Sequence, residues 1–185
     1  MLTDRPLYQR LLGAGWGSLP PVTRALHAPD PVALFEGRAD ISRGSHPLAR
    51  LAAGLLRLPQ AGIGVPARIM VSRAGEGELL ERWYQGRRFA TVQGERAGLL
   101  HERFGPLRLG FRLTASPEGI DFHQQRVALW FIPLPSWLAP RVQARERFEP
   151  GVNGAEDAHL FDVRLTLPGI GLVIAYRGRL LPVSA

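Results

Sequence analysis

The chain has 185 residues, 45% of them hydrophobic, and a formal net charge of +7. This length predicts one domain over residues 1–185 with one well-buried core. The absence of cysteine excludes disulfides, thiolate nucleophiles and cysteine-ligated zinc. No apolar stretch approaches the roughly 20 residues of a membrane-spanning helix. The start of the sequence lacks the basic segment and long apolar run of a secretory signal, so we expect a cytoplasmic protein.

The basic residues are all arginine, 23 in number, with no lysine. An arginine-rich composition without lysine is typical of a GC-rich coding sequence, and it also suits the binding of anions or nucleic acid. The arginines stand singly between apolar residues, whereas a nucleic-acid module gathers them with exposed aromatic residues. We therefore predict no specific nucleic-acid partner.

The first third of the chain predicts three helices and one strand. Apolar residues at helical spacing, bounded by proline and glycine, predict short helices over residues 6–12 and 19–27. Residues 32–42 have the apolar alternation of a strand. Leucines and alanines at helical spacing then predict the longest helix, over residues 46–58, with Ser45 as its N-cap. We expect this helix to pack against a sheet.

From Val65 onward the apolar residues recur with a period of two, and turn residues follow about every ten residues, as in a β-meander. Residues 107–113 alternate most regularly. Residues 161–167 and 172–181 flank a Pro-Gly turn and predict a hairpin. The sequence therefore predicts an α+β fold: short N-terminal helices and one longer helix pack on a strongly curved, mostly antiparallel meander sheet, which forms a half-open barrel.

Standard catalytic signatures are absent from the sequence: it has no GxSxG elbow, HExxH motif or Walker loop. The five histidines are well separated and lack metal-ligand spacing with a carboxylate. Surface or capping roles are expected for them, and no metal site and no cofactor are predicted. Whether the chain is an enzyme stays open, because no catalytic motif can be recognised.

The densest polar cluster is the sequence HERFG at residues 101–105. Alternation along a strand places Glu102 on the opposite face from His101 and Arg103. An inward-facing Arg103 would bind a carboxylate or phosphate through two hydrogen bonds. The alternative is a cross-strand ion pair at the end of a strand.

Asp162, Tyr176 and Arg177 form a second candidate set. Asp162 and Arg177 lie almost symmetrically about the predicted turn at Pro168 and Gly169. A cross-strand contact between them is therefore expected.

The most unusual segment is residues 129–140, with the sequence LWFIPLPSWLAP. Its prolines exclude a regular helix or a central strand. If exposed, Trp130, Phe131 and Trp137 would form an apolar patch at a ligand mouth, a partner surface or a peripheral membrane contact, with flanking arginines that favour anionic lipid. If buried, the segment would be a lid over the open end of the curved sheet. Both alternatives suggest a cavity.

The sequence contains, in order, the motifs LPPVTRALH, FEGRADISRGSHPLARLAAGLLRLP, ERFGPLRLGFRL, WFIPLPSWLAPR and FDVRLTLPGIGLVIAYRG. With these motifs the chain resembles a bacterial family catalogued as domain of unknown function 4166. The resemblance extends from Leu7 to about Leu181. Members of the family occur alone or fused behind a saccharopine-dehydrogenase-like oxidoreductase, which implies a dehydrogenase-like partner protein. The resemblance supplies no reaction.

These observations lead to one main hypothesis: the chain binds a hydrophobic or amphipathic small molecule in a cavity between helix and sheet. This hypothesis fails if the structure holds no pocket of at least about 300 Å³, the lower end for ligand sites. The predicted ligand-binding residues are Arg103, Trp130, Phe131, Trp137, Asp162, Tyr176 and Arg177.

Two other hypotheses stay open. In the first, the chain is an enzyme or an oxidoreductase-associated accessory domain that acts on a lipid-like or isoprenoid substrate. Glu102, His123, Asp162 and Tyr176 would then converge as acid and base groups. In the second, the Trp-rich segment docks on a dehydrogenase-like protein or on a second copy of the chain.

Overall fold

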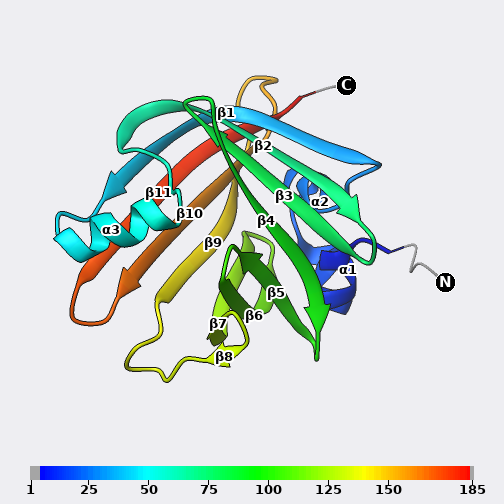
Figure 1. Cartoon of the computed structure of the whole chain (residues 1–185). Coiled ribbons are helices and arrows are strands. Elements are labelled where there is room, and N and C mark those ends of the chain that lie inside the picture. Colours follow the sequence, from blue (N-terminus) through cyan, green and yellow to red (C-terminus); the bar gives the residue numbers. More distant parts are fainter. Residues whose placement is uncertain (1–4, 184–185) are drawn as a thin grey trace.

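Ten antiparallel strands form a closed up-and-down barrel in the computed structural model, which describes residues 5–183 (Figure 1). Almost every strand pairs with its neighbours in the sequence. The strands are β1 (Val32–Arg43), β2 (Gly62–Ala74), β3 (Gly77–Tyr84), β4 (Arg87–Arg96), β5 (Leu99–Phe104), β6 (Leu107–Ser116), β7 (Gly119–Leu129), β9 (Arg141–Glu149), β10 (Ala158–Leu167) and β11 (Gly171–Pro182). The two-residue strand β8 (Ile132–Pro133) pairs with the end of β7 outside this ring.

One pairing between strands that are distant in the sequence closes the barrel. The first strand, β1, pairs with the last, β11, over a long register from Phe35–Pro182 to Arg43–Ile174. Strand β7 pairs with β9 only over Gly119–Phe122. Beyond this stretch the Gln124 side chain bridges the two strands, because its amide donates to the Pro140 carbonyl and accepts from the Val142 amide.

The predicted half-open α+β barrel is therefore wrong: the sheet closes into a ring and the helices are small. A sheet of about ten twisted strands is near the limit at which it curls on itself, and the pairing of the first strand with the last covers the edges that an open sheet would expose. The predicted meander and the hairpin of β10 and β11 are confirmed. The predicted cavity between helix and sheet is also misplaced, since the cavity lies inside the ring of strands.

Glycine allows close packing where β11 pairs with β1 and β10. A Cβ atom on Gly178 would overlap the ring of Phe161 and lie 2.7 Å from the carbonyl oxygen of Arg38. The Phe161 ring packs over the Gly178 backbone in the space that a side chain would need. Such glycine positions are a common means of closing small barrels.

The N-terminal helices lie at the end of the barrel where β1 begins. They are α1 (Leu7–Leu12), the 3-10 helix η1 (Gly13–Ser18) and α2 (Pro21–Leu26), so the two predicted N-terminal helices are confirmed. Leu7, Tyr8 and Leu26 are buried against the strands. The next residue, His27, ends α2 and is also buried in the barrel interior.

Helix α3 (Pro47–Leu55) connects β1 to β2 and is shorter than predicted. Its N-cap is His46, whose Nδ1 accepts from the Leu48 amide, and not Ser45. The helix buries Ala49 and Ala53 rather than its leucines. Figure 1 shows α3 at the left of the barrel and α1 and α2 at the right.

Candidate functional site

A cavity of about 120 Å³ lies in the barrel interior. Its walls are mainly apolar and come from almost every strand and from both N-terminal α-helices. The cavity is well below the roughly 300 Å³ that the binding hypothesis required, so the interior does not enclose a whole drug-sized ligand. For comparison, an engineered apolar cavity of about 150 Å³ holds benzene. The interior thus has room for a small ring or for one segment of a longer molecule. Its apolar lining consists of Leu26, Leu58, Ile69, Leu80, Phe89, Phe104, Leu107, Leu109, Phe111, Phe122, Val142, Ala144, Phe161, Val163, Leu165 and Ile174.

Two buried histidines flank a carboxylate at one side of the cavity. His27 Nε2 lies 2.6 Å from Glu146 Oε2, and His159 Nε2 lies 3.9 Å from the same oxygen. Burial raises the pKa of Glu146, but its neighbours, above all His27 with its hydrogen bond, outweigh this effect and the net pKa is lowered. Glu146 is therefore ionised at neutral pH and can only accept, so His27 Nε2–H is the donor.

His159 is almost completely enclosed, with 1% of its surface exposed. Burial lowers the pKa of His159 to about 4, against the opposing attraction of Glu146. The imidazole is therefore neutral at neutral pH. It lines the cavity as an uncharged group that can donate or accept a hydrogen bond.

A buried ion pair lies on the opposite wall, between Arg82 on β3 and Glu102 on β5. The guanidinium donates to Glu102 Oε1 at 3.2 Å and to Thr91 Oγ1 at 3.2 Å, and it lies over the ring of Phe89. Burial alone would lower the pKa of Arg82. The attraction of Glu102, together with smaller contributions from Tyr84 and Tyr176, outweighs burial and raises the pKa. Both charges are paired, as buried charges must be to avoid a large desolvation cost.

Tyrosines complete the polar part of the lining. Tyr8 stacks on His27 with ring centroids 3.7 Å apart, and its hydroxyl donates to Gln93 Oε1 at 3.3 Å. The ring centroids of Tyr84 on β3 and Tyr176 on β11 lie 5.8 Å apart. Burial raises the pKa of all three tyrosines, so they are neutral hydroxyls.

Several buried polar atoms of the lining have no hydrogen-bond partner among residues 5–183. They are His27 Nδ1, Tyr84 Oη and His159 Nδ1. An unsatisfied buried polar atom costs about 1–3 kcal/mol, and each such atom in a folded protein calls for an explanation. Tyr84 and His159 are uncharged, and His27 lies against the Glu146 carboxylate. The three free atoms therefore match an uncharged hydroxyl or carbonyl of a ligand better than an anion or a cation.

The structure separates the seven residues that the sequence pointed to. Tyr176 lines the interior cavity. Arg103 is exposed on the outer face of β5, and its neighbour Glu102 faces inward, as alternation predicts. Trp130, Phe131 and Trp137 are exposed in and after the β7–β8 turn. The segment is therefore not a buried lid.

Asp162 and Arg177 are cross-strand partners, as expected, but they lie on the outside of the barrel. They line a groove of about 520 Å³ across β1, β11, β10 and β9. Its charges are largely paired with one another: Arg145 with Asp162, Arg177 with Asp40, and Arg179 with Glu149. We interpret the groove as a surface ion-pair network.

The enzyme hypothesis had named Glu102, His123, Asp162 and Tyr176. Only Glu102 and Tyr176 line the interior. His123 bonds Thr114 on the outer face of β6 and β7, and Asp162 lies in the outer groove. Side chains on opposite faces of one sheet cannot converge on one substrate.

Sequence reasoning missed the polar residues that do converge, namely His27, Arg82, Glu146 and His159. For Arg82 a signal existed: it alternates with Leu80 and Tyr84, two inward-facing apolar residues of β3. His159 likewise alternates with Phe161 on β10. Charged and polar residues are rarely buried unless they are paired, so a polar residue at an inward-facing strand position is a candidate for a buried polar site.

The fold and the site together define a class: a small closed up-and-down β-barrel whose apolar interior contains a group of buried, mostly paired polar side chains. Residues 19–180 match the family described as domain of unknown function (DUF4166), and the chain belongs to this family. No curated protein and no solved structure is detectably similar to the chain. Within residues 5–183, no helix is long and apolar enough to cross a membrane.

Proposed function

We propose that the barrel binds a hydrophobic or amphipathic small molecule, of which one uncharged polar end enters the interior cavity. The observation that carries this proposal is the set of unpartnered polar atoms on His27, Tyr84 and His159 within an otherwise apolar cavity. A hydroxyl or carbonyl of the ligand would bond these atoms, and the apolar walls would enclose the adjoining carbon atoms.

The cavity volume limits the ligand. A space of about 120 Å³ accommodates a short chain segment or one ring, so the rest of a longer molecule would extend beyond it. Charged heads fit poorly, because Glu146 repels an anion and Arg82 is already paired with Glu102. Arg103 and Arg177, two of the ligand-binding residues predicted from the sequence, lie outside the cavity.

The test begins with native mass spectrometry of the purified protein and identification of any extracted molecule. Competition against a bound fluorescent fatty-chain probe should then rank 1-decanol above decanoic acid and decylamine. The decisive variant is Ala144→Phe, which fills the cavity from β9, and its matched control is Ala175→Phe on the outer face of β11. Equal probe affinity of Ala144→Phe and the unchanged chain would contradict the proposal.

A second candidate function, proton transfer on a bound substrate, rests on the group formed by His27, Glu146 and His159. Histidine and carboxylate side chains are the groups most often used in general acid and base catalysis. His159 would be the group that meets a substrate, since it is neutral and its Nδ1 is unpartnered. Turnover of the extracted molecule that His159→Gln lowers by much more than it lowers binding would support this function over simple binding.

A further inference from the structure

Antiparallel topology gathers five connecting segments at one end of the barrel. Successive connections of an up-and-down barrel alternate between its two ends, so alternate connections share one end. These segments are residues 43–63, 84–88, 103–108, 129–141 and 167–171, and we call them the α3 end. The N-terminal helices lie at the opposite end, which Figure 1 shows at the right of the barrel.

Helix α3 presents its leucines to solvent. Leu48, Leu51 and Leu55 follow one face of the helix and are 52%, 58% and 75% exposed, while Ala49 and Ala53 face the barrel. An amphipathic helix normally buries its larger apolar residues. The inverted arrangement leaves an unpartnered leucine face at this end.

The segment after β7 forms a second apolar projection at the same end. Phe131 is 81% exposed and Trp137 is 72% exposed. Trp130 has a φ of 54°, a backbone conformation that costs energy in a bulky residue, and its amide bonds the Pro106 carbonyl of the β5–β6 turn. The fold therefore holds this aromatic turn outward instead of folding it onto the barrel.

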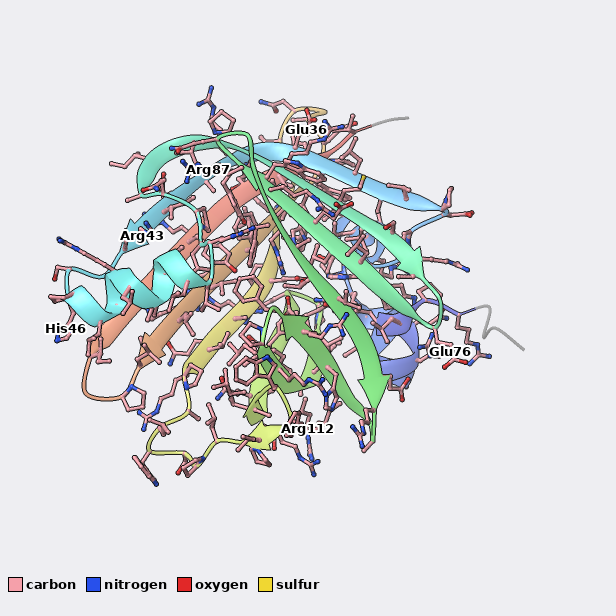
Figure 2. All side chains as sticks on the ribbon, viewed as in Figure 1. Glu36, Arg43, His46, Glu76, Arg87 and Arg112 are labelled. Carbon is pink, nitrogen blue, oxygen red and sulfur yellow. The ribbon has the colours of Figure 1, made fainter. Side chains whose placement is uncertain are left out.

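The charges of the chain are divided between the two ends. The five segments of the α3 end contain eight arginines and no aspartate or glutamate. At the opposite end, residues 74–77, 96–99, 116–119 and 149–158 contain five acidic residues and one arginine, and the helical segment 5–31 adds three arginines and one aspartate. Figure 2 shows Arg43 and Arg87 on the side of α3 and Glu76 on the side of the N-terminal helices.

The arginines of the α3 end are available to a partner. All of them except the half-buried Arg43 are exposed. Within residues 5–183, only Arg88 among the eight forms an ion pair, with Glu81. The remaining positive charges have no acidic side chain to neutralise them, in contrast to the paired arginines of the outer groove.

We propose that the α3 end docks on the surface of an anionic lipid membrane, with the leucine face of α3 and the Trp130–Phe131 turn in the interfacial layer and the surrounding arginines on lipid phosphates. Two separate apolar projections lie at one end of the barrel, and around them are basic residues that lack ion-pair partners in the described part of the chain. This arrangement suits the wide anionic surface of a membrane, which can contact both projections at once without a shaped binding site. Aromatic residues at the tip of such projections suit the membrane–water interface.

This docking does not depend on the proposed ligand. It does give the cavity an orientation, because Leu58, Phe89, Phe104 and Leu165 line it toward the α3 end. A molecule drawn from the lipid layer would meet this apolar wall before it reached the buried histidines.

The experiment is co-sedimentation of the full chain with vesicles, either phosphatidylcholine alone or phosphatidylcholine mixed with phosphatidylglycerol. We expect partition into the anionic vesicles that weakens as salt is raised. The double variant Leu51→Ser, Leu55→Ser should lower the partition coefficient at least about ten-fold, the loss expected on removing two leucines from an apolar layer. Its matched control, Val152→Ser, changes an exposed apolar residue at the opposite end and should leave partition unchanged.

Arginine variants test the electrostatic part of the proposal. Arg50→Gln and Arg108→Gln should each lower partition about five-fold, which corresponds to ~1 kcal/mol per basic residue near an anionic surface. Arg96→Gln, at the opposite end, should have no effect. No partition, equal partition into both kinds of vesicle, or equal losses in both sets of variants would overturn the proposal. Dimers that Leu51→Ser, Leu55→Ser dissociates, without vesicle binding, would assign the surface to a second copy of the chain instead.

Discussion

Acidification should destabilise the barrel through His159, by an amount that follows from its burial. The pKa of this histidine falls from an ordinary value of 6.5 to about 4 in the folded protein, chiefly because burial disfavours the charged imidazolium. Between these two pKa values the unfolded state binds a proton on His159 and the folded state does not. The contribution of the neutral His159 to the free energy of unfolding is therefore fully present above about pH 6.5 and is lost progressively as the pH falls toward 4.

The magnitude follows from the shift of the pKa between 6.5 and about 4. At ~1.4 kcal/mol for each pH unit, the full loss is about 3 kcal/mol, of which about 2 kcal/mol has occurred by pH 5. The variant His159→Gln removes the titrating group and should not show this loss. Glu78, whose pKa burial raises, acts in the opposite direction, and it is present in both proteins.

The assay is urea denaturation at intervals between pH 7.5 and pH 5, compared between the unchanged chain and His159→Gln. The free energy of unfolding should fall about 2 kcal/mol further in the unchanged chain over this range. His123→Gln, on the outer face of β7, is the control and should follow the unchanged chain. Parallel pH dependence of His159→Gln and the unchanged chain would refute the assignment of a neutral, buried imidazole.

Three further predictions concern the closure of the barrel and the polar lining of its interior. Gly178→Ala should lower the free energy of unfolding by about 1–3 kcal/mol, because the new methyl overlaps Phe161. Gly94→Ala has open space at its Cβ position and should change the free energy of unfolding by less than about 0.5 kcal/mol. Equal effects of the two variants in chemical denaturation would contradict this account of the packing at Gly178. Glu146→Gln should cost about 2 kcal/mol by weakening the charge-assisted bond to His27, and Glu118→Gln in an exposed turn should cost little in the same measurement. Tyr84→Phe should leave the melting temperature unchanged or raise it, because the lost hydroxyl has no partner within residues 5–183; a large fall would mean that the hydroxyl is satisfied in solution.

The strands could be predicted from the sequence because their signals are local. Alternation over residues 107–113 and the hairpin around Pro168 and Gly169 both appear in the structure where the sequence placed them. Closure could not be predicted, since the pairing of β1 with β11 joins segments far apart in the chain and has no local signature. Periodicity shows that a strand has two faces, but not which strand will cover its edge.

The orientation of α3 on the barrel could not be predicted either, for a different reason. The leucine spacing of residues 46–58 predicts an amphipathic helix, and the usual inference is that leucines face the core. Here the small side chains of Ala49 and Ala53 face the barrel instead. The spacing shows that the helix has two different faces, but tertiary packing decides which face contacts the barrel.

The candidate site was only partly accessible to sequence reasoning. Tyr176 was found because it belongs to a regular strand. His27 ends a short helix, and nothing in its neighbours shows that it reaches Glu146 from 119 positions away. The tryptophan segment was noticed for its composition, and its exposure depends on a turn geometry that composition alone does not reveal.

The pairing of β1 with β11 also sets the order of events during synthesis. The ribosome releases β1 long before β11, so the growing sheet has two unsatisfied edges, on β1 and on the most recent strand, until β11 pairs between β1 and β10. Through that interval the side of the unfinished barrel is open, and a hydrophobic molecule can reach the future interior without passing either end. Nascent chains that stall before β11 expose edges that pair readily with other chains, and they are the species on which we expect chaperones to act.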